Sequence, residues 1–163
     1  MTTNDHIDRI QKQWRTQRPD LDVTPQGTYG RLSRIADHVT AELNTTFSDH
    51  GISDADFDIL AALRRAGKPY QLTPSDITAT TMMTSGGTSK RIDSLERRQL
   101  VQRQPAHDDA RSCLVSLTKH GLETVDQAIT QHMANEHRML ARFTPAERKQ
   151  LQTLLTTWLS HYE

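Results

Sequence analysis

The chain has 163 residues, of which 34% are hydrophobic, and its 20 Lys and Arg residues are balanced by 20 Asp and Glu residues. This length suits one domain, or a small domain with helical extensions, and the neutral balance excludes overall charge as an argument for nucleic-acid binding. A single cysteine excludes an internal disulfide framework, and neither a signal peptide nor an apolar run of ~20 residues is visible, so we expect a cytoplasmic protein with no membrane partner.

Apolar residues at helical spacing, together with capping residues, predict seven helices. The first is a short N-terminal helix with Ile7, Ile10 and Trp14 on one face. Ser or Thr caps mark the starts of five others, and proline follows three of these caps at the first helical position. The five caps are Thr24, Ser53, Thr73, Thr118 and Thr144.

The middle of the chain adds the remaining helix and the only two strands that we predict. This helix carries Thr88, Ile92 and Leu95 inward. The strands, at 100–103 and 112–117, form a hairpin. The order is therefore five helices, two strands and two helices. We expect a mainly α fold with a small β-wing, a winged helix-turn-helix, which is a shape that places one helix in a DNA major groove.

The fifth predicted helix has the features of a helix that reads DNA. It begins with small residues, three of them hydroxylated, which would let the backbone approach base edges and phosphates. These residues are Ser85, Gly86, Gly87, Thr88 and Ser89. Lys90 and Arg91 follow one turn later. Residues 84–111 carry six cations and four anions, a small positive excess, so a solvated helix with mixed charge is the simpler interpretation until the hairpin is considered.

The loop of the predicted hairpin carries Asp109 and Arg111 two residues apart. A carboxylate beside a guanidinium fixes the direction of the guanidinium, and a fixed arginine suits the negative potential of a narrow minor groove. The alternative is an ordinary surface ion pair, which contributes little.

These motifs together resemble a MarR-type (multiple antibiotic resistance regulator) transcription factor. The resemblance rests on LTPSDITATTMMTSGGTSKRIDSLERRQLVQR at 72–103 and DDARSCLVSLTKHG at 108–121, and the flanking helices match in order and length. It implies a homodimer with intertwined terminal helices that reads a palindromic site on double-stranded DNA. It also implies repression of a neighbouring gene and release by a small aromatic or anionic effector. No cofactor is implied.

The resemblance assigns roles by position and divides the chain. The DNA contacts would be Thr84, Ser85, Gly86, Thr88, Ser89, Lys90 and Arg91, with Arg111 in the minor groove and Asp109 orienting it. Residues 1–48 would serve dimerisation and the ligand pocket, residues 49–118 would bind DNA, and residues 119–163 would complete the dimer interface.

The sequence departs from the family pattern at three positions. Gln99 stands where relatives usually have a glycine that closes the recognition helix, so we expect a strained or a shifted turn there. Ala110 replaces a common basic residue of the wing. Cys113 lies on a wing strand, away from the N-terminal position of the peroxide-sensing members, so we expect a small, partly buried strand residue.

The chain is also similar to the urate-responsive subgroup of this family. Five residue types stand at the matching places: Trp14, Asp58, Arg65, Arg91 and Arg103. A planar purine anion suits a flat aromatic neighbour and a cation, so Trp14 and Arg65 would hold the ligand and Asp58 would repel it or bond a ligand proton. Arg91 and Arg103 would transmit the change to the DNA-reading lobe. Alternatives are a different aromatic or carboxylate effector, or none.

Other classes of function are less well supported. The sequence has no phosphate-binding loop, dinucleotide fingerprint, nucleophile elbow or CxxC motif, so we expect no enzyme. His132 and His137 are five residues apart, which is not a common zinc spacing, and we interpret them as solvated or dimer-face residues rather than a metal site. The remaining alternative is a winged helix used only for protein contacts, without effector binding; the small hydroxylated start of the reader helix argues against it.

Overall fold

The computed structural model describes residues 4–81, 85–105 and 113–163, with the side chain of residue 85 excepted. The chain forms two compact units, Met1–Leu43 and Asn44–Glu163. The division into dimerisation, DNA-binding and dimerisation segments concerns function, and it stays a prediction. Among the described residues, no helix is long and apolar enough to cross a membrane.

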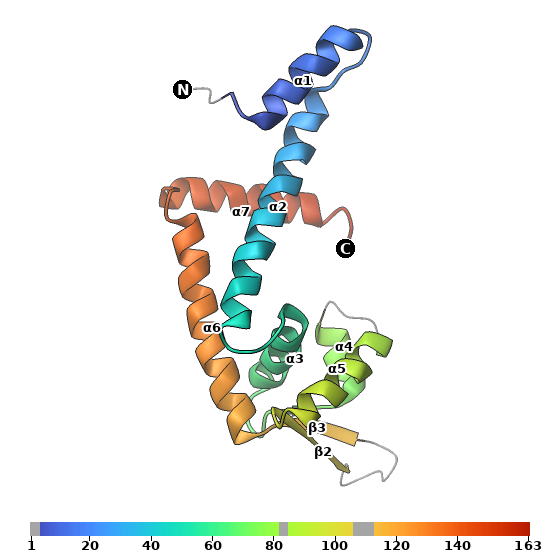
Figure 1. Ribbon diagram of the computed structural model, residues 1–163, viewed down its shortest axis with the longest axis vertical. Coiled ribbons are helices and arrows are strands. Elements are labelled where there is room, and N and C mark those ends of the chain that lie inside the picture. The colour runs from blue at the N-terminus through green and yellow to red at the C-terminus, as the bar shows by residue number, and fades with distance from the viewer. Residues whose placement is uncertain (1–3, 82–84, 106–112) are drawn as a thin grey trace. The chain divides into compact units, whose positions relative to one another are not determined.

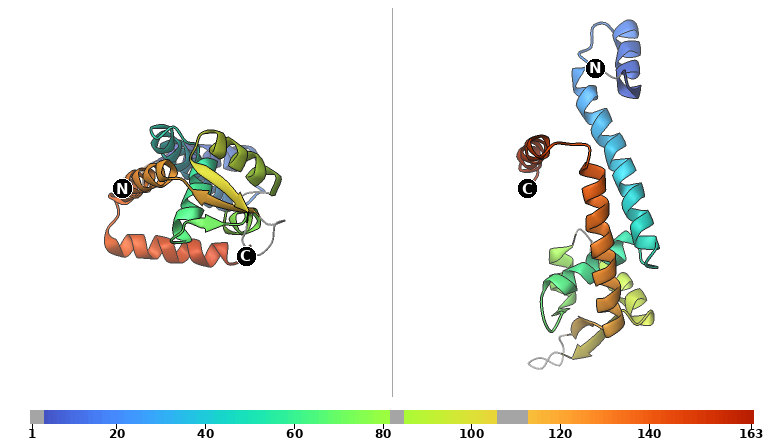
Figure 2. Two further views of the ribbon diagram at one scale, coloured as in Figure 1. Left: turned by 90° about the horizontal axis from the view of Figure 1, so that it is seen from below. Right: turned by 90° about the vertical axis from the view of Figure 1, so that its left-hand side faces the viewer.

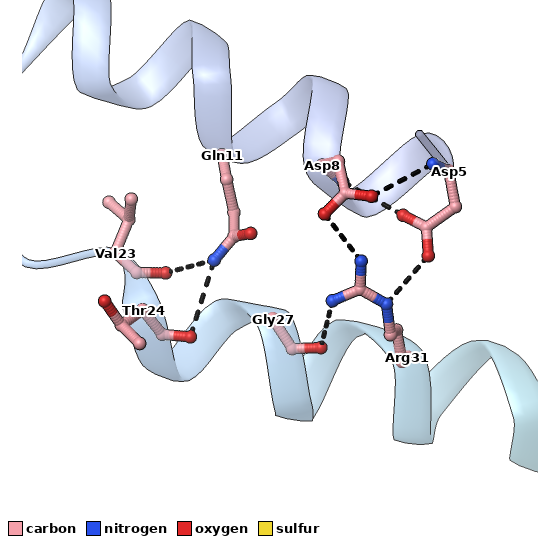
Figure 3. A network of polar contacts seen from close by, with 7 residues as sticks. All are labelled: Asp5, Asp8, Gln11, Val23, Thr24, Gly27 and Arg31. Carbon is pink, nitrogen blue, oxygen red and sulfur yellow. Dashed lines mark hydrogen bonds and ion pairs between the residues drawn. The ribbon is translucent and has the colours of Figure 1, made fainter. Parts of the chain in front are cut away.

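The N-terminal unit consists of α1 (His6–Gln17) and the greater part of α2 (Thr24–Ser48). Asp5 caps α1 in a capping box with Asp8. The guanidinium of Arg31, from α2, donates to Asp5 at 2.7 Å and to Asp8 at 2.6 Å (Figure 3). This Arg31 network therefore ties the start of α1 to α2 through the two carboxylates that also cap it.

The two helices of this unit approach closely because glycines line α2. A Cβ placed on Gly30 would lie 2.8 Å from Ile7 Cδ1, so the absence of a side chain makes room for buried Ile7. One turn further along α1, the amide of Gln11 donates to the carbonyl of Val23 at 2.7 Å (Figure 3). Trp14, on the next turn, keeps nearly half of its surface exposed.

The second unit contains the end of α2 and the remaining helices and strands (Figure 1). Their order is α3 (Asp54–Arg65), β1 (Gln71–Leu72), α4 (Pro74–Thr80), α5 (Ser85–Arg97), β2 (Val101–Pro105), β3 (Cys113–Leu117), α6 (Lys119–Leu140) and α7 (Pro145–Leu159). The seven predicted helices and the fold class are confirmed. The prediction that the hairpin holds the only strands is wrong, because β1 also pairs with β3; a two-residue strand is too short to show a period.

The sheet is antiparallel, in the order β1-β3-β2, so β2 is an edge strand. Val101 pairs with Leu117 and Arg103 with Val115. Leu117, Val101 and Val115 are buried and join the core between the sheet and the helices. That core is built from fully buried aliphatic side chains of six elements. They are Ile59, Leu60, Leu63, Ile77, Ile92, Leu95, Val101, Val115 and Val125.

The turn from α5 into β2 is fixed by Gln99. Its φ is +58°, in the left-handed region, and it closes a Schellman motif. In that motif the N–H of Leu100 donates to Leu95 O at 3.0 Å and the N–H of Gln99 donates to Glu96 O at 2.9 Å. The strained turn expected from a non-glycine residue at this position is confirmed, and it sets the direction in which β2 leaves the helix.

The start of α6 lies directly against this turn. The Thr118 N–H donates to Leu100 O at 3.1 Å, and the Thr118 hydroxyl caps the helix by accepting from Gly121 N. A Cβ on Gly121 would lie only 1.8 Å from Leu100 O. The junction of helix and sheet therefore requires glycine at this position.

An aromatic cluster fills the space between the end of α2, α3 and α6. The ring of Phe47 stacks on Phe57 with 4.4 Å between centroids and on His132 at 5.3 Å. The interpretation of His132 as a solvated or dimer-face residue is wrong, because its side chain is only 12% exposed and packs on two aromatic rings. Helical spacing alone did not distinguish an outward histidine from one that packs inward.

The last helix has no buried residue. It follows the end of α6 that lies away from the sheet (Figure 1, Figure 2). Apolar side chains along α7 are exposed in the single chain: Leu151, Leu154, Leu155 and Leu159. Leu140 at the end of α6 lines a groove with three of them, Leu151, Leu155 and Leu159. We call these five leucines the α7 face.

Candidate functional site

The inward face of α5 is held by the core and by α4. Ile92 and Leu95 are fully buried. Thr88 is also buried, at 1% exposure, and its hydroxyl accepts a hydrogen bond from Thr78 at 3.1 Å. The prediction that Thr88 contacts DNA is therefore wrong for this conformation: the helical spacing that places it beside Ile92 also turns it away from solvent.

The opposite face of α5 is open at its N-terminal end. Gly86, Ser89 and Lys90 are exposed. A Cβ on Gly86 would meet nothing within 4 Å, so none of the described residues covers this position. Among the described residues, Lys90 forms no ion pair. This end of the helix combines a free ammonium with small side chains and with the positive end of the helix dipole, which favours an anion.

Four of the predicted DNA contacts stay predictions, because the structure does not describe their side chains. Thr84, Asp109 and Arg111 lie outside the described residues, and the side chain of Ser85 is not described although α5 begins there.

Arg91 of α5 and Arg98, which directly follows this helix, share one buried carboxylate. Asp56, on the first turn of α3, is 3% exposed in its side chain, and its Oδ2 accepts from Arg98 Nη1 at 2.8 Å. Arg91 Nη1 lies 3.5 Å from Asp56 Oδ1 and 3.5 Å from Ser53 Oγ. Burial alone would raise the pKa of Asp56, but the Ser53 backbone N–H and the Arg98 guanidinium lower it below its ordinary value of 3.8.

The two arginines are held unequally. Arg98 also donates to Gly51 O at 2.6 Å, so its guanidinium is fixed between two acceptors. Asp56 Oδ1, in contrast, accepts no hydrogen bond from the described residues, and Arg91 approaches it only as a charge. Arg98 therefore secures α5 to α3, whereas Arg91 can turn toward an external anion at lower cost.

Arg103, on β2, contacts two carboxylates of α5. Its Nη2 pairs with Asp93 at 2.5 Å and its Nη1 with Glu96 at 2.6 Å. Its backbone N–H also donates to Glu96 Oε1 at 3.1 Å. The hydrogen bond to Asp93 contributes most to raising the pKa of the Arg103 guanidinium, and the contacts with Glu96 raise it further. We call the three residues the Arg103 bridge.

The five predicted effector residues are divided between the two units. Trp14 belongs to the N-terminal unit and the other four to the second. Asp58 and Arg65 lie seven residues apart on α3, so they share a face of that helix, with Asp58 half-buried and Arg65 exposed. Arg65 forms no ion pair with the described part of the chain. The ion pairs of Arg91 and Arg103 are made with other carboxylates.

Sequence reasoning missed the residues that hold the site together. Arg64, rather than Arg65, is tied down: its Nε donates to Asp126 of α6 at 2.7 Å, and its guanidinium lies 5.1 Å from the centre of the Tyr70 ring. Asp56 and Arg98 are 42 positions apart. A local pattern could have indicated one feature only, the spacing of Asp93 and Glu96 on one face of the helix before β2.

Within residues 4–81, 85–105 and 113–163, no group of three or more His, Cys, Asp or Glu residues is placed to hold a metal ion. Cys113 is half-buried on β3 opposite Pro105, as expected for a strand residue.

Comparison with known proteins gives the family. The model of the MarR family matches residues 50–112, the segment from the turn before α3 to the wing. The HTH-type transcriptional regulator PecS of Dickeya dadantii is 37% identical over 149 residues, which are 91% of this chain and 90% of PecS. The chain belongs to the MarR family. The relatives that it matches are transcriptional regulators rather than enzymes.

Two solved structures extend the comparison. A variant of MarR from E. coli, crystallised with operator DNA, superposes with a TM-score of 0.72 at 25% identity, over 85% of this chain and 99% of MarR. BpsR of Bordetella bronchiseptica, whose DNA binding is regulated by 6-hydroxynicotinic acid, superposes with a TM-score of 0.69 at 25% identity, over 79% of this chain and 90% of BpsR.

Proposed function

We propose that this MarR-family regulator is a homodimeric repressor of a neighbouring gene, which reads a palindromic operator and is released by a small planar anion. The observation that carries the DNA-reading part is the open N-terminal end of α5, where Gly86, Ser89 and Lys90 are exposed beside a helix terminus and Lys90 has no ion pair with a described residue. The operator complex of MarR, with the same fold, supports this assignment.

In this proposal the N-terminal end of α5 enters the major groove. Thr84, Ser85, Gly86 and Ser89 approach base edges and phosphates, and Lys90 contacts phosphate. Arg91 leaves the side of Asp56 to join them, since Asp56 retains Arg98. Arg111 enters the minor groove, oriented by Asp109. Thr88 has no direct role because it is buried.

The homodimer is supported by the α7 face. Within the described part of the chain, this helix of 15 residues has no buried side chain and carries a row of exposed leucines. Leucine surface of this kind is stable in water when it is covered by a complementary copy. A second protomer also supplies the second recognition helix that a palindrome requires.

The effector is proposed to be a purine anion such as urate. Trp14 offers an exposed aromatic face and Arg65 an exposed cation, while Asp58 senses the charge or a proton of the ligand. Arg91 and Arg103, both engaged with protein carboxylates, transmit the change rather than hold the ligand. The regulation of BpsR by 6-hydroxynicotinic acid supports the general class of small aromatic acids.

The test is fluorescence anisotropy of a labelled duplex from the region upstream of the gene, with and without urate. Binding that weakens steeply with salt and is lost on adding urate supports the whole proposal. Binding that urate leaves unchanged removes the purine and directs the search to aromatic acids. Absence of binding at low salt, to this duplex and in a genome-wide binding experiment, contradicts DNA reading and favours a protein-contact role for the winged helix.

Effector residues are separated from structural ones by variants. Trp14→Phe and Asp58→Asn should weaken the ligand response and leave DNA affinity nearly unchanged. Trp158→Phe, which alters the other tryptophan of the chain, is the matched control and should keep the response. Loss of DNA binding in both Trp14→Phe and Asp58→Asn would show that these residues support the fold instead.

A further inference from the structure

The Arg103 bridge joins the wing to the recognition helix. One guanidinium forks between Asp93 and Glu96, and Glu96 also accepts the backbone N–H of Arg103. Asp93 and Glu96 lie three residues apart on α5, so they present two acceptors on one face of the helix. A single arginine of β2 is thus held at two side-chain atoms and one backbone atom by the same helix.

The backbone contact matters because β2 is the edge strand of the sheet. β3 occupies one side of β2, and among the described residues no strand occupies the other. An N–H on an open edge otherwise faces water or pairs with another chain. Here the Arg103 N–H donates to Glu96 at 3.1 Å, so α5 takes the place of a neighbouring strand at this position of the edge.

We infer that Arg103 is a positioning residue, which fixes the wing relative to α5 so that both DNA contacts meet one operator in register. This inference rests on the proposed reading of DNA. The turn at Gln99 sets where β2 begins, and the bridge, four residues further along, sets the direction in which it continues. Without the bridge, the described residues of β2 keep their pairing with β3 and the burial of Val101.

The charges of the bridge argue against a direct contact between Arg103 and DNA. Its one cation is outnumbered by two carboxylates, so the cluster carries a net negative charge next to the reading surface. Such a cluster repels phosphate. Moreover, the three side chains are 32–57% exposed, and exposed ion pairs contribute little to global stability, so variants of the bridge are expected to fold.

The direction in which Glu96→Ala changes operator affinity distinguishes positioning from simple electrostatics. Glu96→Ala removes a negative charge and releases the Arg103 cation, so electrostatics alone predicts tighter binding of DNA. Positioning predicts the opposite, because the wing loses its attachment. We expect Glu96→Ala and Arg103→Ala each to weaken operator binding by about tenfold, and Arg103→Lys, which keeps the charge but not the fork, to recover part of the loss.

The control is Arg97→Ala. Arg97 is an arginine of the same helix, and among the described residues its side chain has one hydrogen-bond partner, Asp93 O. Arg97→Ala removes one positive charge, as Arg103→Ala does, but leaves the bridge intact, and we expect operator affinity to fall by about twofold.

A double-mutant cycle with the wing tip tests the mechanism. In an Arg111→Ala background, Arg103→Ala should weaken operator binding by at most about a further twofold, because the wing no longer has a DNA contact to position. Arg97→Ala should cost the same in both backgrounds. Additive effects of Arg103→Ala and Arg111→Ala, or tighter binding by Glu96→Ala, would overturn the inference.

Amide hydrogen exchange of the free protein keeps the test independent of the proposed function. Arg103→Ala should speed exchange within Val101–Gln104 by about tenfold or more, and Arg97→Ala should not. Unchanged exchange would overturn the inference even if the protein binds DNA. If Arg103→Ala speeds exchange but the protein binds no DNA, the bridge still attaches the wing to α5. The positioning role would then fail together with the proposed function.

Discussion

The most direct test of the helix–sheet junction is Gly121→Ala. A methyl group at this position would lie 1.8 Å from Leu100 O and 2.8 Å from Leu100 C, whereas ordinary contact begins at 3.4 Å. The two groups must separate by about 1.6 Å. Leu100 O also accepts the N–H and the hydroxyl of Thr118, at 3.1 and 3.2 Å, so the movement strains or breaks both bonds.

The expected cost follows from opposing terms. Overpacking costs about 3 kcal/mol and the lost hydrogen bonds about 1 kcal/mol, while alanine gains about 1 kcal/mol over glycine within a helix. The net loss of about 3 kcal/mol should lower the melting temperature by about 6–12 °C. Gly86→Ala is the control, because its Cβ meets nothing within 4 Å and helix propensity alone then predicts a small gain.

The assay is urea unfolding followed by circular dichroism, at one protein concentration for all variants because assembly would shift apparent stability. A Gly121→Ala protein as stable as the parent chain would refute the reasoning, since it would mean that α6 can move away from the turn without loss. A Gly86→Ala protein that loses as much stability as Gly121→Ala would remove the steric explanation as well.

Three other outcomes are expected. Gln99→Gly should add about 1 kcal/mol to the free energy of unfolding by relieving the positive φ, and Gln99→Ala, which keeps the strain, should not; equal stabilities in urea would contradict this. The pKa of Asp56 is lowered from 3.8, so its ionised form stabilises the fold at neutral pH, and this stabilisation is lost as pH falls below about 4. Asp56→Asn should therefore lower the free energy of unfolding by about 2 kcal/mol at pH 7 and flatten the acid side of the curve of stability against pH. A curve of unchanged shape would count against the pairing of Asp56 with Arg98. Arg31→Ala should accelerate amide exchange in α1, and Arg34→Ala should not; equal rates would mean that the Arg31 network does not hold this helix.

The sequence predicted the helices well because their signals are local. Caps such as Ser53 and Thr144 with an acidic residue three positions later require no knowledge of the rest of the chain, and both form capping boxes. The strained turn at Gln99 was predictable for a similar reason, since one position of a helix terminus favours glycine whatever surrounds it. The strand β1 was not predictable, because its existence depends on a partner more than 40 residues away.

The candidate site was predicted less completely, because pairing across elements leaves no local pattern. The sequence identified Arg91 and Arg103 as important cations, but it could not show that Asp56 and Glu96 neutralise them. The assignment of Thr88 shows a different limit. Thr88 fits both the helical spacing of a core residue and the hydroxylated start of a DNA-reading helix. Only the packing of α4 on α5 decided between these two assignments.

The α7 face has a consequence for how the molecule forms. Isolated helices of about 15 residues are marginal in water, and α7 has no buried side chain in the single chain to compensate. In the proposed homodimer, the partner that covers these leucines completes the helix, so that folding of the C-terminus and association become one event. Helix content should then fall on dilution, and newly made chains at low concentration would begin to regulate only once enough copies are present to complete one another.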